Sequence, residues 1–131
     1  MKDHNFEDVF TPEILSKLFP EDRTDKFFDA LLGDAAEGTY DISLDFSGQN
    51  RDRLIFQFCL KQRPGKCLAC HLTYGLPQVF SRHPVINIKG LFREIGELLR
   101  EQVRCTDWRI GDTQEISGGF HTIPLFISLE T

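Results

Sequence analysis

The sequence predicts an α+β domain in which helices cover an antiparallel sheet. Three observations support this class: two short helical segments open the chain, apolar and polar residues alternate from residue 39 onward, and a long amphipathic segment precedes a further group of strands. The predicted order is α-α-β-β-β-α-β-β, which is typical of helices packed against one sheet. We expect a single domain over residues 1–131, with the helical segment 1–35 packed on it.

Both N-terminal helices carry start and stop signals. Residues 11–20 (TPEILSKLFP) begin with a threonine that can cap a helix and a proline suited to its first position, and they end at a second proline. Residues 22–33 (DRTDKFFDALLG) contain two capping candidates, Asp22 and Thr24, followed by an apolar stripe and a terminal glycine. The sequence therefore predicts an N-terminal pair of helices.

Three strands are predicted next. Residues 40–46, 54–61 and 68–74 each alternate between apolar and polar side chains, and the stretches SGQNRD and QRPGK between them are rich in turn residues. Consecutive strands joined by short turns pair as an antiparallel meander. The apolar faces of the second and third strands align if Phe58 lies beside Cys70.

The rest of the chain is predicted to return to a helix and then to strands. Residues 75–85 (GLPQVFSRHPV) are expected to form an irregular connection, since two prolines punctuate them. The following helix, residues 87–103, has apolar residues at helical spacing behind Asn87 as its cap. Strands return within residues 106–130, where Pro124 predicts an edge strand or a bulge.

The charge is unevenly distributed. The chain has a net charge of −5, with 4 basic and 12 acidic residues in positions 1–50 but 11 basic and 5 acidic residues in positions 51–109. An acidic total argues against a nucleic-acid partner, for which a basic surface is expected. The basic middle block indicates a local face that attracts anions. The alternative is an ordinary charged surface.

Composition also predicts the compartment. No stretch approaches the ~20 apolar residues of a membrane span, and the first ten residues lack the apolar core of a secretory signal. The four cysteines are therefore expected to be reduced thiols in the cytoplasm. We expect no membrane partner.

The string C-x-x-C-H at Cys67, Cys70 and His71 suggests three kinds of chemistry. A c-type haem requires export and an axial ligand, and the only methionine is Met1, so we exclude it. In a strand, the two cysteines lie on opposite faces, and a thioredoxin-like motif would instead open a helix. We therefore predict reduced cysteines and no cofactor. A metal-binding or thiol-redox role through Cys67 and Cys70 stays as the alternative, with further ligands drawn from His71, Cys59, Cys105, His83 or His121.

The connection over residues 74–84 and the start of the next helix form the predicted binding site. The connection is long for a loop in a compact domain, and it leads into a helix N-terminus, which favours anions. We expect it to bind a small anionic ligand or the carboxylate of a partner protein. The alternative is that Phe80 plugs the sheet and Arg82 forms a structural ion pair. The candidate residues are Tyr74, Gln78, Ser81, Arg82 and His83.

These residues predict a non-catalytic binding or protein-interaction module. No catalytic triad, carboxylate pair or phosphate-binding glycine loop is recognisable, and no mechanism can be written for an enzyme that uses Arg82 and His83. The outer face of the second strand, with Ile55, Gln57 and Cys59, is less polar than that of the first. A helix of this chain or a second subunit is expected to cover it, so a homo-oligomer is one arrangement that the sequence leaves open.

One segment resembles a known group of proteins. Residues 63–86 (RPGKCLACHLTYGLPQVFSRHPVI) are similar to a run in an uncharacterised family of small bacterial proteins, some of which are labelled pancreas/duodenum homeobox protein. Flanking LFP, FFDAL and YDI stretches extend the resemblance over most of the chain. The resemblance implies a bacterial family and brings no activity with it. A homeodomain is a basic three-helix unit, so the label does not fit an acidic, strand-rich chain.

Overall fold

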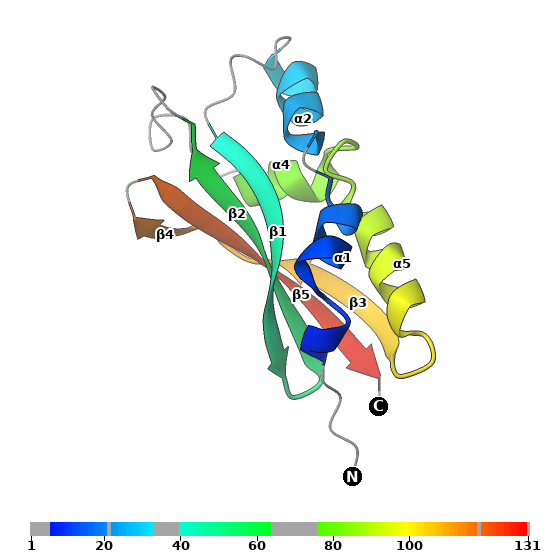
Figure 1. Cartoon of the computed structure of the whole chain (residues 1–131). Coiled ribbons are helices and arrows are strands. Elements are labelled where there is room, and N and C mark those ends of the chain that lie inside the picture. Colours follow the sequence, from blue (N-terminus) through cyan, green and yellow to red (C-terminus); the bar gives the residue numbers. More distant parts are fainter. Residues whose placement is uncertain (1–5, 21, 33–39, 64–75, 118, 131) are drawn as a thin grey trace.

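The computed structural model describes residues 6–20, 22–32, 40–63, 76–117 and 119–130, and it confirms the predicted α+β class. Figure 1 shows one twisted antiparallel sheet with the helices packed against it. The elements are a short 3-10 helix (Phe6–Asp8), α1 (Pro12–Leu18), α2 (Arg23–Leu32), β1 (Tyr40–Asn50), β2 (Arg53–Gln62), α4 (Leu76–Arg82), α5 (Ile88–Leu99), β3 (Arg104–Ile110), β4 (Gln114–Ser117) and β5 (Phe120–Glu130).

The N-terminal helices follow their sequence signals. The Thr11 hydroxyl oxygen accepts the backbone N–H of Ile14 at 3.3 Å, so it caps α1 as predicted. Helix α2 begins at Arg23, which leaves Asp22 rather than Thr24 at the capping position. The hydroxyl of Thr24 is used elsewhere, against the sheet.

The first two strands form the predicted hairpin. Leu44 lies opposite Phe58, and the two strands continue to a two-residue turn at positions 51–52. The turn is shorter than predicted because β1 continues through residues 47–50 (SGQN). A bulge between Phe46 and Gly48 shifts the register of this extension. Gly48 has φ +131°, a conformation that side chains rarely adopt, so the glycine serves the bulge rather than the turn.

The neighbour of β2 differs from the expectation. The sheet order is β1-β2-β5-β3, with β4 paired to the first part of β5. Phe58 therefore has Leu44 on one side and Ile123 on the other. Because a strand has only two edges, the predicted pairing of Phe58 with Cys70 is wrong. The predicted third strand, residues 68–74, lies outside the described residues.

Pro124 lies in a central strand, so the predicted edge position of β5 is wrong, and the pairing of β5 with β2 runs through Pro124 without the alternative bulge. Its carbonyl oxygen accepts the N–H of Gly111 at 2.8 Å, so its missing N–H also faces that side. There β3 ends at Ile110 and β4 begins at Gln114. The proline is tolerated because its absent donor faces the gap between two short strands, which satisfies the same physical requirement as an edge.

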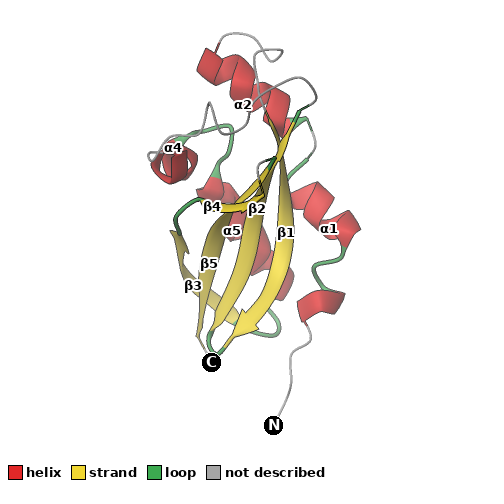
Figure 2. Ribbon diagram, turned by 90° about the vertical axis from the view of Figure 1, so that its left-hand side faces the viewer, coloured by secondary structure: helices red, strands yellow, loops and turns green. Residues whose placement is uncertain are grey.

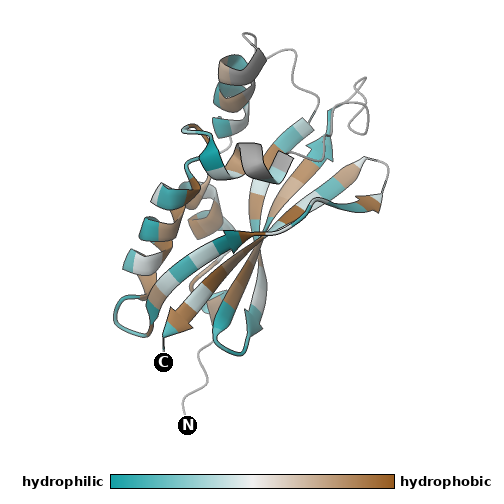
Figure 3. Cartoon of the chain, turned by 180° about the vertical axis from the view of Figure 1, so that it is seen from behind, coloured by the Kyte–Doolittle hydropathy of each residue, from teal (hydrophilic) through white to brown (hydrophobic). Residues whose placement is uncertain are grey.

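The core lies between one face of the sheet and the helices. Phenylalanine rings from both layers meet edge-on: Phe58 of β2 has its ring centroid 5.7 Å from that of Phe19 and 5.5 Å from that of Phe80, and Phe80 lies 5.5 Å from Phe27. These side chains are buried. Figure 3 shows the apolar and polar residues that alternate along the strands, as expected for a sheet with one covered face.

Helices do not provide a membrane span in the part of the chain that the structure describes. None of them is both long enough and apolar enough to cross a bilayer.

Candidate functional site

The segment predicted as an irregular connection contains a helix. Residues 76–82 form α4, seen beside the upper part of the sheet in Figure 2. Pro77 lies in the first turn, where no intrahelical N–H bond is lost, and Pro84 follows the C-terminal end. A proline at each end of a short helix gives the same sequence pattern as a loop that contains two prolines. Phe80 is fully buried between Phe27 and Phe58, so the middle of the segment belongs to the core.

His83 is held by contacts within the chain. Its Nδ1 accepts the N–H of Val85 at 3.1 Å, and its carbonyl oxygen accepts the N–H of Asn87 at 2.9 Å. The imidazole ring lies edge-on to Phe27, with 4.8 Å between the ring centroids. These contacts fix the turn between α4 and α5. Among the described residues, no hydrogen bond of the His83 ring involves its Nε2.

The other predicted site residues are not gathered into one site by the described structure. Arg82 is exposed at the end of α4, and Ser81 is half-buried on the preceding position. Gln78 belongs to α4, and Tyr74 lies outside the described residues. The structural alternative for Arg82, an ion pair, is absent among the residues described.

The start of α5 is built as predicted around Asn87. Its side-chain oxygen accepts the N–H of Gly90 at 3.2 Å, and its backbone adopts a left-handed conformation with φ 51°. A side chain at position 90 would place its Cβ 2.9 Å from Asn87 Cγ, a distance that real contacts do not show. Asn87 and Gly90 therefore shape the first turn of α5 together.

A cavity of about 320 Å³ opens at this turn. Arg23 of α2 lines it together with Arg93 and Glu94 of α5. Arg guanidinium groups bind carboxylates and phosphates through paired hydrogen bonds, so the cavity has the chemistry of an anion site with one acidic group at its margin. The lining residues are Arg23, Asn87, Gly90, Leu91, Arg93 and Glu94.

The two arginines differ in how the chain holds them. The Arg23 guanidinium donates to the carbonyl of Leu18 at 3.4 Å and lies 5.0 Å from the ring centroid of Phe19. These contacts orient it and use only part of its five donors. Arg93 makes no ion pair within the residues described.

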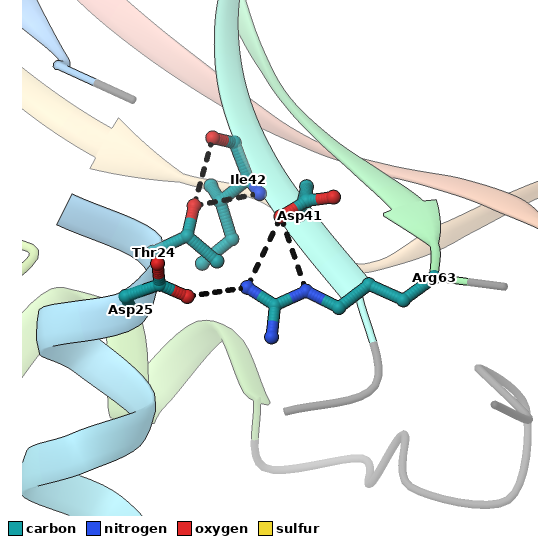
Figure 4. A network of polar contacts seen from close by, with 5 residues as sticks. All are labelled: Thr24, Asp25, Asp41, Ile42 and Arg63. Atoms are coloured by element: carbon teal, nitrogen blue, oxygen red, sulfur yellow. Dashed lines mark hydrogen bonds and ion pairs between the residues drawn. The ribbon is translucent and has the colours of Figure 1, made fainter. Parts of the chain in front are cut away.

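The residues that follow Arg23 anchor α2 to the sheet (Figure 4). Thr24 Oγ1 accepts the N–H of Ile42 at 2.9 Å and donates to its carbonyl at 3.1 Å, so it satisfies a free backbone position on the outer edge of β1. Arg63 pairs with Asp25 at 2.8 Å and with Asp41 at 3.1 Å. Because this network fixes the start of α2, it also fixes the position of Arg23 at the cavity.

Cys59 does not have the environment of a reactive thiol. Burial and the nearby Asp45 carboxylate raise the pKa of its thiol to about 11, and a hydrogen bond with Ser43 offsets this only in part. A thiol with this pKa is protonated near neutral pH and is a poor nucleophile and metal ligand. Burial also raises the pKa of Cys105.

The metal-binding alternative stays a prediction. Cys67, Cys70 and His71 lie outside the described residues, and within the described ranges no three His, Cys, Asp or Glu side chains are grouped for a metal ion. His121, a further candidate, is buried on the core face of β5 with its Nε2 4.0 Å from a Glu115 oxygen.

The expected cover of the outer face of β2, by a helix of this chain or a second subunit, stays a prediction. Ile55, Gln57 and Cys59 are half-buried there. On the neighbouring strand the ring of Phe126 lies under two guanidinium groups, at 4.5 Å from Arg53 and 5.5 Å from Arg109.

Sequence reasoning located the start of α5 but missed both cavity arginines. Arg93 lies six residues beyond the helix cap Asn87, and its place on a helix face is readable from the sequence. Arg23 is far from α5 in the chain, so only the packing of α2 reveals it.

Comparison with protein-family models, curated proteins and solved structures finds no match for this chain. The bacterial family suggested by residues 63–86 therefore stays a prediction.

Proposed function

We propose that this protein is a non-catalytic binding module that holds an anionic group in the cavity at the start of α5. One observation carries the proposal: Arg23 and Arg93, which come from different helices, line the same small cavity. The anionic group is a carboxylate or phosphate of a small ligand, or an acidic side chain of a partner protein. On the strength of the four cysteines we place this activity in the cytoplasm.

The charges at the cavity support an anion over a cation. Two arginines and one glutamate, Glu94, line the cavity, so its lining residues carry a net positive charge. The surrounding block of sequence, residues 51–109, is basic although the whole chain is acidic. Guanidinium–anion contacts at a partly open site weaken as salt screens them, so affinity is expected to fall as NaCl is added.

Isothermal titration tests the proposal with two probes, inorganic phosphate and succinate. Arg93→Gln removes the positive charge and keeps a polar side chain, and we expect it to weaken binding by about tenfold or more. Arg100→Gln is the matched control, because Arg100 is exposed at the other end of α5 and, among the residues that the structure describes, its ion pair is with Glu97, at 3.5 Å. We expect this variant to bind like the wild type.

Two results would contradict the proposal. The first is that neither probe binds the wild-type chain. The second is that Arg93→Gln and Arg100→Gln lose affinity equally, which would indicate a general effect of protein charge rather than a site.

A further inference from the structure

A second cavity, which Glu94 also lines, lies between α1 and α5. These helices lie side by side on the same face of the sheet (Figure 1). The cavity is an open groove of about 310 Å³ with apolar residues from both helices, Ile14 and Leu18 from α1 and Leu98 from α5. Leu98 is 41% exposed, an unusual degree for a leucine on a helix packed against a core. We call this surface the α1–α5 groove.

The two walls of the groove carry opposite charges. Lys17 stands on the α1 wall, and Glu94 and Glu97 stand on the α5 wall. Within the described residues, neither Lys17 nor Glu94 forms an ion pair, while Glu97 has one exposed contact with Arg100. Charges of opposite sign thus line one groove without neutralising each other inside the chain.

We propose that a second copy of this chain docks in the α1–α5 groove through a twofold axis. In a twofold contact the same surface meets itself. Lys17 of each copy then faces Glu94 and Glu97 of the other, and each Leu98 is removed from water against the apolar floor of the opposite groove. Opposite charges on opposite walls are complementary to themselves under such an axis.

The charge pattern favours a second copy over a partner of a single charge. A basic helix in this groove would meet Lys17, and an acidic one would meet Glu94 and Glu97, so either would place like charges together. Another protein that reproduces the same mixed pattern is the remaining alternative, and it would leave the chain alone monomeric.

The groove predicts weak association. Stable interfaces bury about 800 Å² on each partner, and six lining residues cover only part of such an area. Sedimentation equilibrium with the full chain over about 1–200 µM therefore covers the micromolar range expected of a small interface. We expect the wild type to change from monomer to dimer within this range.

Charge reversal tests the geometry. Lys17→Glu and Glu94→Lys/Glu97→Lys should each weaken self-association by about tenfold or more, because each places like charges opposite each other. An equimolar mixture of the two variants restores the opposite-charge pairs in a mixed dimer, and it should associate as tightly as the wild type. If the charges instead attracted each other across the groove of a single chain, mixing the two variants would not restore association.

Lys61→Glu is the matched control, since Lys61 is exposed on β2 and does not line the groove. It should dimerise like the wild type, and circular dichroism confirms that each variant is folded. A wild-type chain that stays monomeric throughout, or a mixture that fails to associate although both variants are folded, would overturn the proposal.

The groove and the anion cavity can be judged separately. Lys17 does not line the anion cavity, so Lys17→Glu should bind phosphate like the wild type even where it no longer dimerises. Loss of phosphate binding in Arg93→Gln, conversely, should leave the dimer intact.

Discussion

Two polar clusters begin at adjacent residues of α2. One is paired within the chain, and the other lines a cavity. Thr24 and Asp25 belong to the network with Asp41, Arg63 and the backbone of Ile42, in which each polar group has a partner at 2.8–3.1 Å. Arg23 faces the cavity at the start of α5 instead, where Arg93 and Glu94 have no ion-pair partner among the described residues.

The contrast separates polar groups that hold the fold from polar groups that face outward. A buried polar group that loses its partner destabilises the folded state. A charged group that faces an open cavity is hydrated in the free protein, so its removal costs little stability and affects whatever it binds. Substitutions in the first cluster should change the free energy of unfolding, whereas substitutions in the second should change affinity.

The largest effect is expected from Thr24→Val. Valine keeps the shape of threonine, but it leaves the N–H and C=O of Ile42 without a partner in a site where Thr24 is only 1% exposed. We expect the free energy of unfolding to fall by about 2–3 kcal/mol in urea denaturation. Thr106→Val is the control, since its hydroxyl contact with Ser128 is exposed, and it should cost less than about 0.5 kcal/mol. Equal costs for both variants would break the distinction drawn for Thr24.

A smaller loss of the free energy of unfolding is expected from His83→Ala. This variant tests whether the histidine holds the fold or binds a ligand. The variant removes the ring contact with Phe27 and the acceptor for the Val85 N–H. Together these should cost about 1–2 kcal/mol, with phosphate affinity unchanged. Arg82→Ala is the exposed neighbour for comparison and should cost about 0.5 kcal/mol or less. A His83→Ala variant that is fully stable but binds phosphate weakly would return the residue to the binding site.

Arg63→Gln should have a modest effect, because its partners Asp25 and Asp41 are 62% and 66% exposed. Water screens such pairs, and we expect about 0.5–1 kcal/mol. A double-mutant cycle with Asp41→Asn isolates the pair, and 1 M NaCl should remove most of its coupling energy. A coupling energy that is absent at low salt would show that the pair does not hold α2.

Sequence patterns predicted the parts of the fold that depend on neighbours in the chain. The cap at Thr11, the hairpin of β1 and β2 and the cap at Asn87 all follow from local spacing. The structure adds the register of the hairpin, in which Leu44 lies opposite Phe58. The partner of Phe58 on its other side could not be predicted in this way. Ile123 is distant in sequence, and alternation does not reveal which of several apolar strands will be adjacent.

The candidate site was predicted only in part for the same reason. Asn87, which lines the cavity, could be found from capping, whereas Arg82 and His83, which loop length pointed to, do not line it. The prolines at positions 77 and 84, however, suit both a loop and the two ends of a short helix. Packing against β2 decides that Phe80 faces the core. The placement of α2 decides that Arg23 lines the same cavity as Arg93. Neither has a local signal in the sequence.

Thermal unfolding with and without inorganic phosphate tests the central contrast most directly. Phosphate should raise the Tm of the wild type and of Thr24→Val alike, by about 4 °C at ten times the Kd, although Thr24→Val starts from a lower Tm. Arg93→Gln should start from the Tm of the wild type and gain only the small increase that phosphate gives to proteins in general. An Arg93→Gln variant that gains as much as the wild type would contradict the assignment of the cavity to an anion.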